Sequence, residues 1–354
     1  MPEASLLPTA PPLVTTDLPG TGGRIGDAPE DFQVDEIPLY EPAGEGEHLY
    51  LLLEKRGWNT LDALRVIARA AGVRERDMGS AGMKDRHAVT TQWISLPPGA
   101  SVPEADRLPE GLRIRTLSRH RNKLRTGHLL GNRFVLRIVD VTHPENAPAI
   151  AERLRVRGTW NGFGPQRFGH GGRNVHRALA WLDSLVEEAG RRTKRSQNKL
   201  YSSVVQSEVF NRYIHLRIAV GLDRPLRGEV VRLDGTGSHF AVESPEAEAE
   251  RWSTGDLLPT GPMPGPRGPQ PTDDALALER EACLAAGLDE ARLGVLASHA
   301  PGTRRDLRLP VPDLDLTVDG DVLQLSFPLP AGAYATQVVR EFTRSPFLPT
   351  PELD

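Results

Sequence analysis

Apolar and polar residues alternate in several short runs near the two ends of the chain, as they do in β-strands with one buried face. The first run begins at Phe32. We expect residues 48–53 to pair with it across the glycine-containing turn at 42–46. Further strands are predicted at residues 91–96, 114–117, 134–141 and 322–327. Both ends of the chain are therefore expected to be rich in β-structure.

In the middle of the chain, apolar residues recur at helical spacing instead. They predict helices at residues 175–189, 203–220 and 274–286. Shorter amphipathic runs predict helices at 60–71, with Thr60 as the N-cap, and at 336–342. A run of prolines and glycines at 259–271 predicts a loop. Because a last strand and helix would complete the first domain, the helical middle is expected to be an insertion.

The length and composition set broad limits on the architecture. A chain of 354 residues is longer than one hydrophobic core usually serves, which favours two domains. Residues 1–22 are rich in proline and small residues, and we expect a disordered tail there. The single cysteine, Cys283, excludes an intramolecular disulfide and suits a reducing cytoplasm. No run of about 18 apolar residues is present, so we expect no membrane span.

Positive charge is concentrated in two stretches, although the formal net charge is −4. Residues 111–139 hold eight lysines or arginines and no acid, and residues 191–199 hold five more. A charge run is usually only a solvated face. A run of this length favours nucleic acid as the partner, because the local field matters more than net charge for capturing a phosphate backbone.

One loop combines an acid with two cations. It begins at Gly82, and Asp85 stands in it between Lys84 and Arg86. The helix before it and the strand after it would hold the loop on a rigid scaffold, where catalytic groups are often found. An aspartate between two cations is more often a surface ion pair that contributes little. The residue types alone leave Asp85 open as a nucleophile, a base or a surface group.

A second candidate is Phe134, which follows Asn132 and Arg133 in a basic strand. Its ring could stack an unpaired base, and such stacking is worth about 1–3 kcal/mol. An aromatic residue in an alternating strand is more often part of the core. The histidines are scattered singly and none has ligand spacing with a second histidine or cysteine, so we expect no metal site.

Several motifs together resemble those of the TruD-type pseudouridine synthases, which isomerise a uridine in tRNA. The longest is Ala-Gly-Met-Lys-Asp-Arg-His-Ala-Val-Thr-Thr-Gln-Trp at 81–93. Others are Pro-Glu-Asp-Phe at 29–32, Gly-Asn-Arg-Phe at 131–134, Phe-Gly-Pro-Gln-Arg-Phe-Gly at 163–169 and Leu-Pro-Ala-Gly-Ala-Tyr-Ala-Thr at 329–336. They occur in the family's order, and the resemblance extends from about Gly20 to Glu341.

The resemblance implies an α+β fold. It would contain the pseudouridine synthase core, with a mixed, largely antiparallel sheet flanked by helices, and an inserted α/β domain. The core would comprise residues 23–156 and 304–354, and the insertion residues 157–303. The chain departs from the family at Gly162, where relatives commonly have a second aromatic residue.

The resemblance also implies which residues act. Asp85 occupies the position of the family's catalytic aspartate, and Phe134 that of its base-stacking phenylalanine. Asn132 and Lys84 would lie in the substrate site. Arg24 stands just ahead of the Pro-Glu-Asp-Phe motif, where the family has a cation that pairs with the aspartate. Contacts to RNA are expected from Arg119, Arg121, Lys123, Arg125, Gln166 and Arg167.

The implied reaction is a cofactor-free isomerisation of one uridine, by resemblance at position thirteen of tRNA. The glycosidic bond breaks, the uracil turns, and C5 bonds to the same sugar carbon. The carboxylate either attacks a carbon or removes a sugar proton, and the sequence leaves both routes open. We expect a cytoplasmic monomer that binds tRNA, with no metal and no membrane association.

Two other functions fit parts of the sequence. A non-catalytic tRNA- or RNA-binding factor would use the same basic run but would not need the loop around Asp85. An RNA methyltransferase would need a glycine-rich loop between a strand and a helix, and Gly20–Gly23 lacks those flanking elements.

Overall fold

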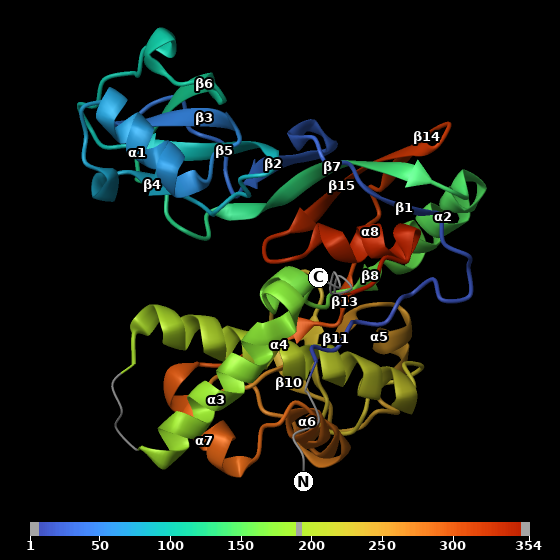
Figure 1. Cartoon of the computed structure of the whole chain (residues 1–354). Helices are drawn as coiled ribbons and strands as arrows, with labels where there is room; N and C mark the ends of the chain where they lie inside the picture. Colours follow the sequence, from blue (N-terminus) through green and yellow to red (C-terminus); the bar gives the residue numbers. More distant parts are fainter. Residues whose placement is uncertain (1–6, 189–192, 348–354) are drawn as a thin grey trace, which may run out of the picture.

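The computed structural model describes residues 7–188 and 193–347, and these form two bodies that lie one above the other in Figure 1. The upper body contains a nine-stranded sheet. The lower body contains the longest helices and a four-stranded sheet. None of the helices in the described ranges is long and apolar enough to cross a lipid bilayer.

The large sheet is mixed and mainly antiparallel. Its strand order is β14-β15-β7-β2-β5-β3-β6, and β1 and β4 pair with β7 and β5. Among the paired strands of the described residues, only β2 and β5 run parallel to each other. The bounds are β1 Gly22–Ile25, β2 Phe32–Pro38, β3 His48–Arg56, β4 Gly79–Ser80, β5 Val89–Leu96, β6 Leu112–His120, β7 Leu129–Val141, β14 Asp315–Asp319 and β15 Val322–Pro330. The α+β class with a mixed, largely antiparallel sheet is confirmed.

Amphipathic helices cover this sheet. Helix α1 (Thr60–Ala70) buries Leu64 and Ile67 against β3 and β5 in one apolar cluster. Its N-cap is Asn59, whose side chain accepts a hydrogen bond from the Asp62 amide, so the predicted N-cap at Thr60 is one residue late. Helices α2 (Ala147–Arg157) and α8 (Ala335–Thr343) pack on a second cluster formed around β7 and β15.

The lower body has its own core. Helices α3 (Arg173–Glu187), α4 (Arg195–Val220), α6 (Asp273–Ala285) and α7 (Glu290–His299) enclose one large apolar cluster. The sheet order beside them is β10-β9-β11-β12. The remaining bounds are β9 Val230–Leu233, β10 His239–Ala241, α5 Ala249–Ser253, β11 Leu257–Met263 and β12 Thr303–Asp306. A separate core is what an inserted domain requires.

A short ladder joins the two bodies. Strand β8 (Thr159–Trp160) enters the lower body and pairs antiparallel with β13 (Arg308–Leu309), which leaves it. The expected border at 303/304 falls inside β12, and β12 pairs with β11 of the lower sheet. The pairing therefore places the return to the upper body between Asp306 and Arg308.

Two expectations about strands are wrong. Residues 48–53 belong to β3, which pairs with β5 and β6 and not with β2, because β2 lies between β7 and β5. The proline-rich run expected as a loop begins inside β11. Strand β11 pairs with β9 up to Pro259 and with β12 from Thr260 onward, so each neighbour covers only part of it.

The expected disordered tail at 1–22 is ordered over its described part, from residue 7 onward. Two fully buried carboxylates of other elements hold it. Glu208 of α4 accepts hydrogen bonds from the amide and hydroxyl of Thr9, and Glu341 of α8 accepts them from the amides of Val14 and Thr15. A buried carboxylate needs donors. The N-terminal segment supplies these donors and is ordered by them, which its proline-rich composition does not indicate.

The N-terminal segment also accounts for the glycine at 162. A Cβ built on Gly162 would lie 2.2 Å from Cγ of Pro11, so no side chain fits there. Pro11 is held in turn by Arg340, whose guanidinium donates to its carbonyl oxygen. The chain therefore has at position 162 a glycine packed against its own N-terminal segment.

We expect Gly162→Ala to lower the free energy of unfolding by about 1–3 kcal/mol, because the added methyl group collides with Pro11. Gly294→Ala is the matched control. Gly294 lies in α7 with open space at its Cβ, and alanine there should stabilise the helix by about 0.5–1 kcal/mol. Urea titrations of both variants measure the difference. Equal stabilities would contradict the packing of Pro11 on Gly162.

Candidate active site

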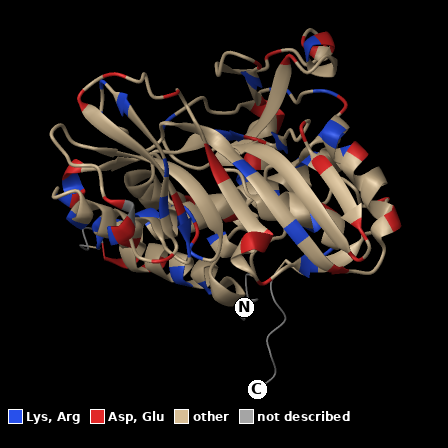
Figure 2. Cartoon of the chain, turned by 90° about the horizontal axis from the view of Figure 1, so that it is seen from above, with Lys and Arg blue, Asp and Glu red and all other residues tan. Residues whose placement is uncertain are grey.

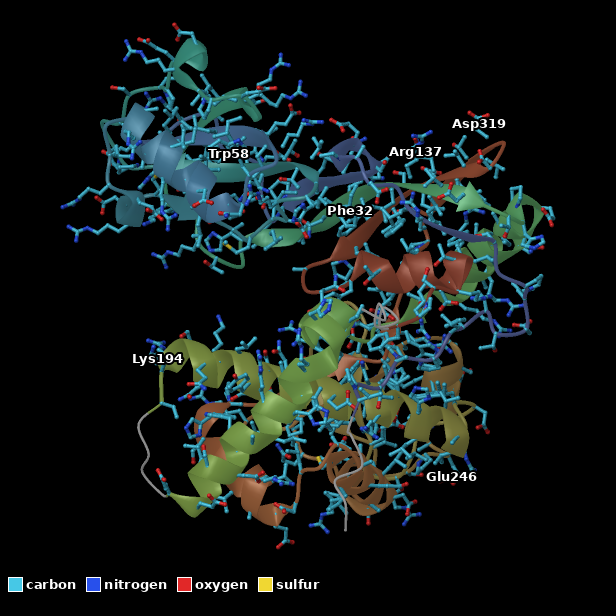
Figure 3. The ribbon with its side chains drawn as sticks, viewed as in Figure 1. Phe32, Trp58, Arg137, Lys194, Glu246 and Asp319 are labelled. Atoms are coloured by element: carbon cyan, nitrogen blue, oxygen red, sulfur yellow. The ribbon has the colours of Figure 1, made fainter. Side chains whose placement is uncertain are left out.

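A cavity of about 170 Å³ lies where segments distant in sequence meet. Phe32, which lines it, projects from β2 in the upper body (Figure 3). The full lining consists of Phe32, Val34, Met83, Lys84, Asp85, Asn132, Phe134, Gln166, Ala333, Tyr334, Ala335 and Thr336. The fold therefore gathers five of the predicted site residues: Lys84, Asp85, Asn132, Phe134 and Gln166.

The register of β7 explains why Asn132 and Phe134 share this cavity. Residues two apart on a strand project from the same face. Phe134 lies opposite Val34 of β2 and Phe327 of β15, and Asn132 lies opposite Glu36 of β2. The central position of β7 thus places both side chains where β2 and β15 flank them.

Phe134 is both a core residue and a cavity residue. Its ring is 8 % exposed and stacks on Phe327 with the centroids 5.8 Å apart. Phe32 meets it edge to face at 6.3 Å. The structural and the functional interpretation of the sequence are therefore compatible, because packing on two sides holds the ring still while the rest of it lines the cavity.

Asn132 carries an unused acceptor. Its Oδ1 is buried and has no hydrogen-bond partner in the described part of the chain. Buried polar atoms without partners are rare, and a catalytic or binding role is one explanation for them. Since Asn132 lines the cavity, this oxygen is available to an N–H or O–H group of a ligand.

Lys84 forms a buried ion pair with Glu36 and not with Asp85. Its Nζ lies 2.8 Å from Oε2 of Glu36, and the two side chains are 4 % and 0 % exposed. The other carboxylate oxygen of Glu36 accepts a hydrogen bond from the amide of Trp93. The pair joins the loop to β2 and β5, and Glu36 was not recognised in the sequence because its partner lies 48 residues away.

A ring of buried polar groups holds the start of the loop. The Lys84 amide donates to Thr60 Oγ1, the Thr60 hydroxyl donates to Gln92 Oε1, and Gln92 Nε2 donates to the carbonyl of Gly82. Gly82 itself has no positive φ, so a special glycine conformation is not what shapes the loop. The polar groups of α1 and β5 shape it instead.

Lys55, at the end of β3, lies beneath the same loop and is fully buried. Its Nζ donates to the carbonyl oxygens of Trp58, Lys84 and Asp85 at 2.7, 3.3 and 2.6 Å. Burial lowers the pKa of Lys55 to about 8, although the charge of Asp85 opposes this and that of Lys84 adds to it. The sequence showed no signal that could have identified this lysine.

Asp85 itself is exposed at the cavity. Its Oδ1 accepts a hydrogen bond from the His87 amide at 2.9 Å, which orients the carboxylate. Arg86 turns away and donates to the carbonyl of Gly57. Asp85 is therefore held by the backbone of its own loop.

Arg24 does not meet Asp85. It lies in exposed ion pairs with Asp27 and Asp140, and it is not part of the cavity. The expectation that Arg24 pairs with the aspartate disagrees with this arrangement. The physical reason is local, because two nearer carboxylates satisfy the guanidinium.

Four of the predicted RNA-contacting cations, Arg119, Arg121, Lys123 and Arg125, lie away from the cavity, on β6 and the turn after it. Figure 2 shows that lysine, arginine and acidic positions are interspersed over the molecule. Glu45 pairs with Arg121, Lys123 donates to the carbonyl of Arg76, and Arg119 donates to that of Gly46. Arg125 makes no ion pair among the described residues. The acid-free run in sequence is thus partly neutralised by acids from neighbouring segments.

The second basic run lies in the lower body. Arg191 and Arg192 fall outside the described residues. Lys194, Arg195 and Lys199 stand at and near the start of α4, at the edge of the lower body where Figure 3 labels Lys194. They are exposed, so their charge is open to solvent.

The lower body completes the cavity through Gln166, and the upper body adds Tyr334 from the segment between β15 and α8. Gln166 lies in the turn at Pro165–Arg167 and belongs to the lining. Arg167 does not line the cavity, but Nη2 of its guanidinium donates to the Tyr334 hydroxyl at 2.6 Å. Phe32, Tyr334 and Thr336 were not singled out as site residues, although the motifs at 29–32 and 329–336 contain them.

These features define a class of site: an exposed carboxylate beside a small cavity bounded by aromatic rings and a free amide acceptor. Such a cavity suits one planar base taken out of its stack, and the carboxylate suits a base-modifying enzyme.

Comparison with known proteins gives the family. The model of the family described as tRNA pseudouridine synthase D (TruD) matches residues 12–182 and 172–342. A tRNA pseudouridine synthase D of Anaeromyxobacter dehalogenans (strain 2CP-C) is 44 % identical over 340 residues, which cover 94 % of this chain and 96 % of the relative. A protein of the same name from Thermus thermophilus is 41 % identical over 338 residues, covering 93 % and 91 %. The chain belongs to the TruD family of tRNA pseudouridine synthases.

A solved structure shares the fold. The crystal structure of a Methanosarcina mazei protein superposes with a TM-score of 0.74 at 23 % identity, over 94 % of this chain and 96 % of that one. At this identity the likeness concerns the fold alone.

The pair of Glu36 and Lys84 provides a stability test. Glu36→Gln and Lys84→Met each leave one buried charge without its partner, and each should lower the free energy of unfolding by about 3–5 kcal/mol. The double variant removes both charges and should lose clearly less than the sum of the two. Urea titrations of the wild type, the two single variants and the double variant give the coupling. Additive losses would show that the two groups do not interact.

Proposed function

We propose that this chain converts a uridine of tRNA to pseudouridine, with Asp85 as the catalytic group. Membership of the TruD family supports the reaction class and the tRNA substrate. The observation that supports the assignment of the residue is that Asp85 lines the same cavity as Phe134 and Asn132.

The cavity is suited to the substrate base. Phe134 and Phe32 offer aromatic surface for stacking, and stacking contributes about 1–3 kcal/mol toward holding an extruded base. Asn132 offers its free Oδ1 to a donor such as the imide N–H of uracil. Extrusion itself costs a few kcal/mol, which contacts elsewhere along the tRNA must offset.

The roles of the remaining residues follow from their positions. Lys84 supports the loop through Glu36, and Gln166 supplies a polar group from the lower body. Arg119, Arg121, Lys123 and Arg125 lie away from the cavity, where they would contact the tRNA backbone. Arg167 acts by holding the Tyr334 hydroxyl.

A monomer as the working unit is also proposed. The target at position thirteen of tRNA is part of the proposal. Both routes remain in it, the covalent attack by the carboxylate and the removal of a sugar proton, since each needs Asp85 within reach of the nucleotide.

We expect Asp85→Asn to lower pseudouridine formation by at least about 10²-fold, the lower end of what a positioned acid or base contributes. The binding of tRNA should change little, because asparagine keeps the shape and the hydrogen bond from His87. Mapping pseudouridine in tRNA incubated with each enzyme gives the rate and the position. Near-normal activity of the variant would remove Asp85 from catalysis, and a wild type that modifies no tRNA would favour a binding factor.

Phe134→Leu separates stacking from core packing. Leucine keeps most of the apolar volume beside Phe327 but removes the aromatic face. We expect a loss of about 5- to 150-fold in kcat/KM, equivalent to 1–3 kcal/mol of stacking, with the fold retained. Kinetics and a thermal melt on the same preparation are the measurements. Unchanged kinetics together with a lowered melting temperature would assign Phe134 to the core alone.

A further inference from the structure

We propose that Lys55, in its ammonium form, is a positioning residue that fixes the backbone on which Asp85 is carried. The inference rests on the proposed function, since it concerns how the same site is kept in shape. Lys55 does not line the cavity, so any effect on the reaction must pass through the loop.

The first support is the geometry of the ammonium group. Its three protons match three carbonyl oxygens, those of Trp58, Lys84 and Asp85. The carbonyls of Lys84 and Asp85 belong to the peptide units on the C-terminal side of these two residues. Trp58 lies in the segment between β3 and α1, so one side chain ties the loop to the fixed elements beneath it.

The second support is what surrounds the charge. Lys55 is 0 % exposed and makes no ion pair among the described residues. Its ammonium is therefore compensated by carbonyl dipoles and by the nearby charge of Asp85, while Lys84 repels it and is itself balanced by Glu36. A buried ammonium is costly unless such groups face it, so a lysine here is explained by what its three donors hold.

The third support is that, among the described residues, three other cations that could have held Asp85 are bound to other groups. Lys84 pairs with Glu36, Arg86 bonds to Gly57, and Arg24 pairs with Asp27 and Asp140. Lys55 is the cation whose charge interacts with Asp85 from within the scaffold.

The lowered pKa of Lys55, about 8, makes the arrangement sensitive to pH. Above that value the amine loses one donor and its charge, so the loop is held less tightly. The effect on global stability has the opposite sign. Between about pH 8 and the usual lysine range the unfolded chain holds more protons, so this group makes folding more favourable as the pH rises. The titration of Lys55 itself therefore does not promote unfolding above pH 8.

The test compares Lys55→Met, Lys55→Gln and the wild type with one tRNA. We expect Lys55→Met to lower kcat about 10- to 100-fold, as for a misplaced catalytic group, with KM for tRNA little changed. Lys55→Gln keeps amide donors without a titrating charge and should recover part of kcat.

The pH dependence is the second measurement. The wild-type kcat should fall above pH 8, and the Lys55→Gln variant should lack that fall. Arg65→Met, which removes an exposed cation from the outer face of α1, is the matched control.

A readout that needs no catalysis distinguishes this inference from the proposed function. Hydrogen–deuterium exchange of peptides covering residues 82–88 should be faster in Lys55→Met than in the wild type and unchanged in Arg65→Met. Faster exchange without any pseudouridine formation by the wild type would uphold the role of Lys55 and reject the proposed function. Unchanged exchange, or a loss confined to KM, would overturn the inference. If Lys55→Met does not fold, the pH profiles of the wild type and Lys55→Gln decide it.

Discussion

The loop that carries Asp85 depends on buried charges that must be compensated where they lie. Glu36, Lys55 and Lys84 are all nearly inaccessible to solvent, and each has its partners within the scaffold. Burying a charge is unfavourable unless it is paired or hydrogen-bonded. If the backbone of the loop moved, these charges would lose their partners, which costs free energy. The result is a stiff support beneath an exposed carboxylate. Preorganisation of this kind is what a catalytic group needs before the substrate arrives.

The two bodies are joined at the site by more than the chain connections. Gln166 reaches the cavity from the lower body, and Arg167 of the same turn holds Tyr334 of the upper body. The N-terminal segment adds a second link, because Thr9 bonds to α4 and Val14 to α8. The relative placement of the bodies therefore bears on the shape of the cavity. The glycine at 162, packed against Pro11, belongs to this second link.

Charge along the sequence was an incomplete guide to charge on the surface. Residues 111–139 contain no acid, yet Glu45 and Glu54 of other segments pair with Arg121 and Arg115. Pairing between strands brings together residues far apart in the chain, and a linear count cannot include it. The cations nevertheless remain on the exposed face of β6 and its turn. A polyanionic partner is still compatible with them.

The sequence alone determined the α+β class, the family, and the positions of α1, α3, α4, α6 and α8 and of β2, β3, β5, β6, β7 and β15, and its resemblance to the family indicated Asp85, Asn132 and Phe134 as site residues. The elements follow from local periodicity, and the class, the family and the site residues follow from several short motifs, within each of which the residues lie close together along the chain. Tertiary structure decided which strands pair, that the N-terminal segment is ordered, and that Arg24 serves Asp27 and Asp140 rather than Asp85. It also introduced Lys55 and Glu36. Their importance comes from burial and from partners distant in sequence, and the neighbouring residues in the sequence indicate neither property.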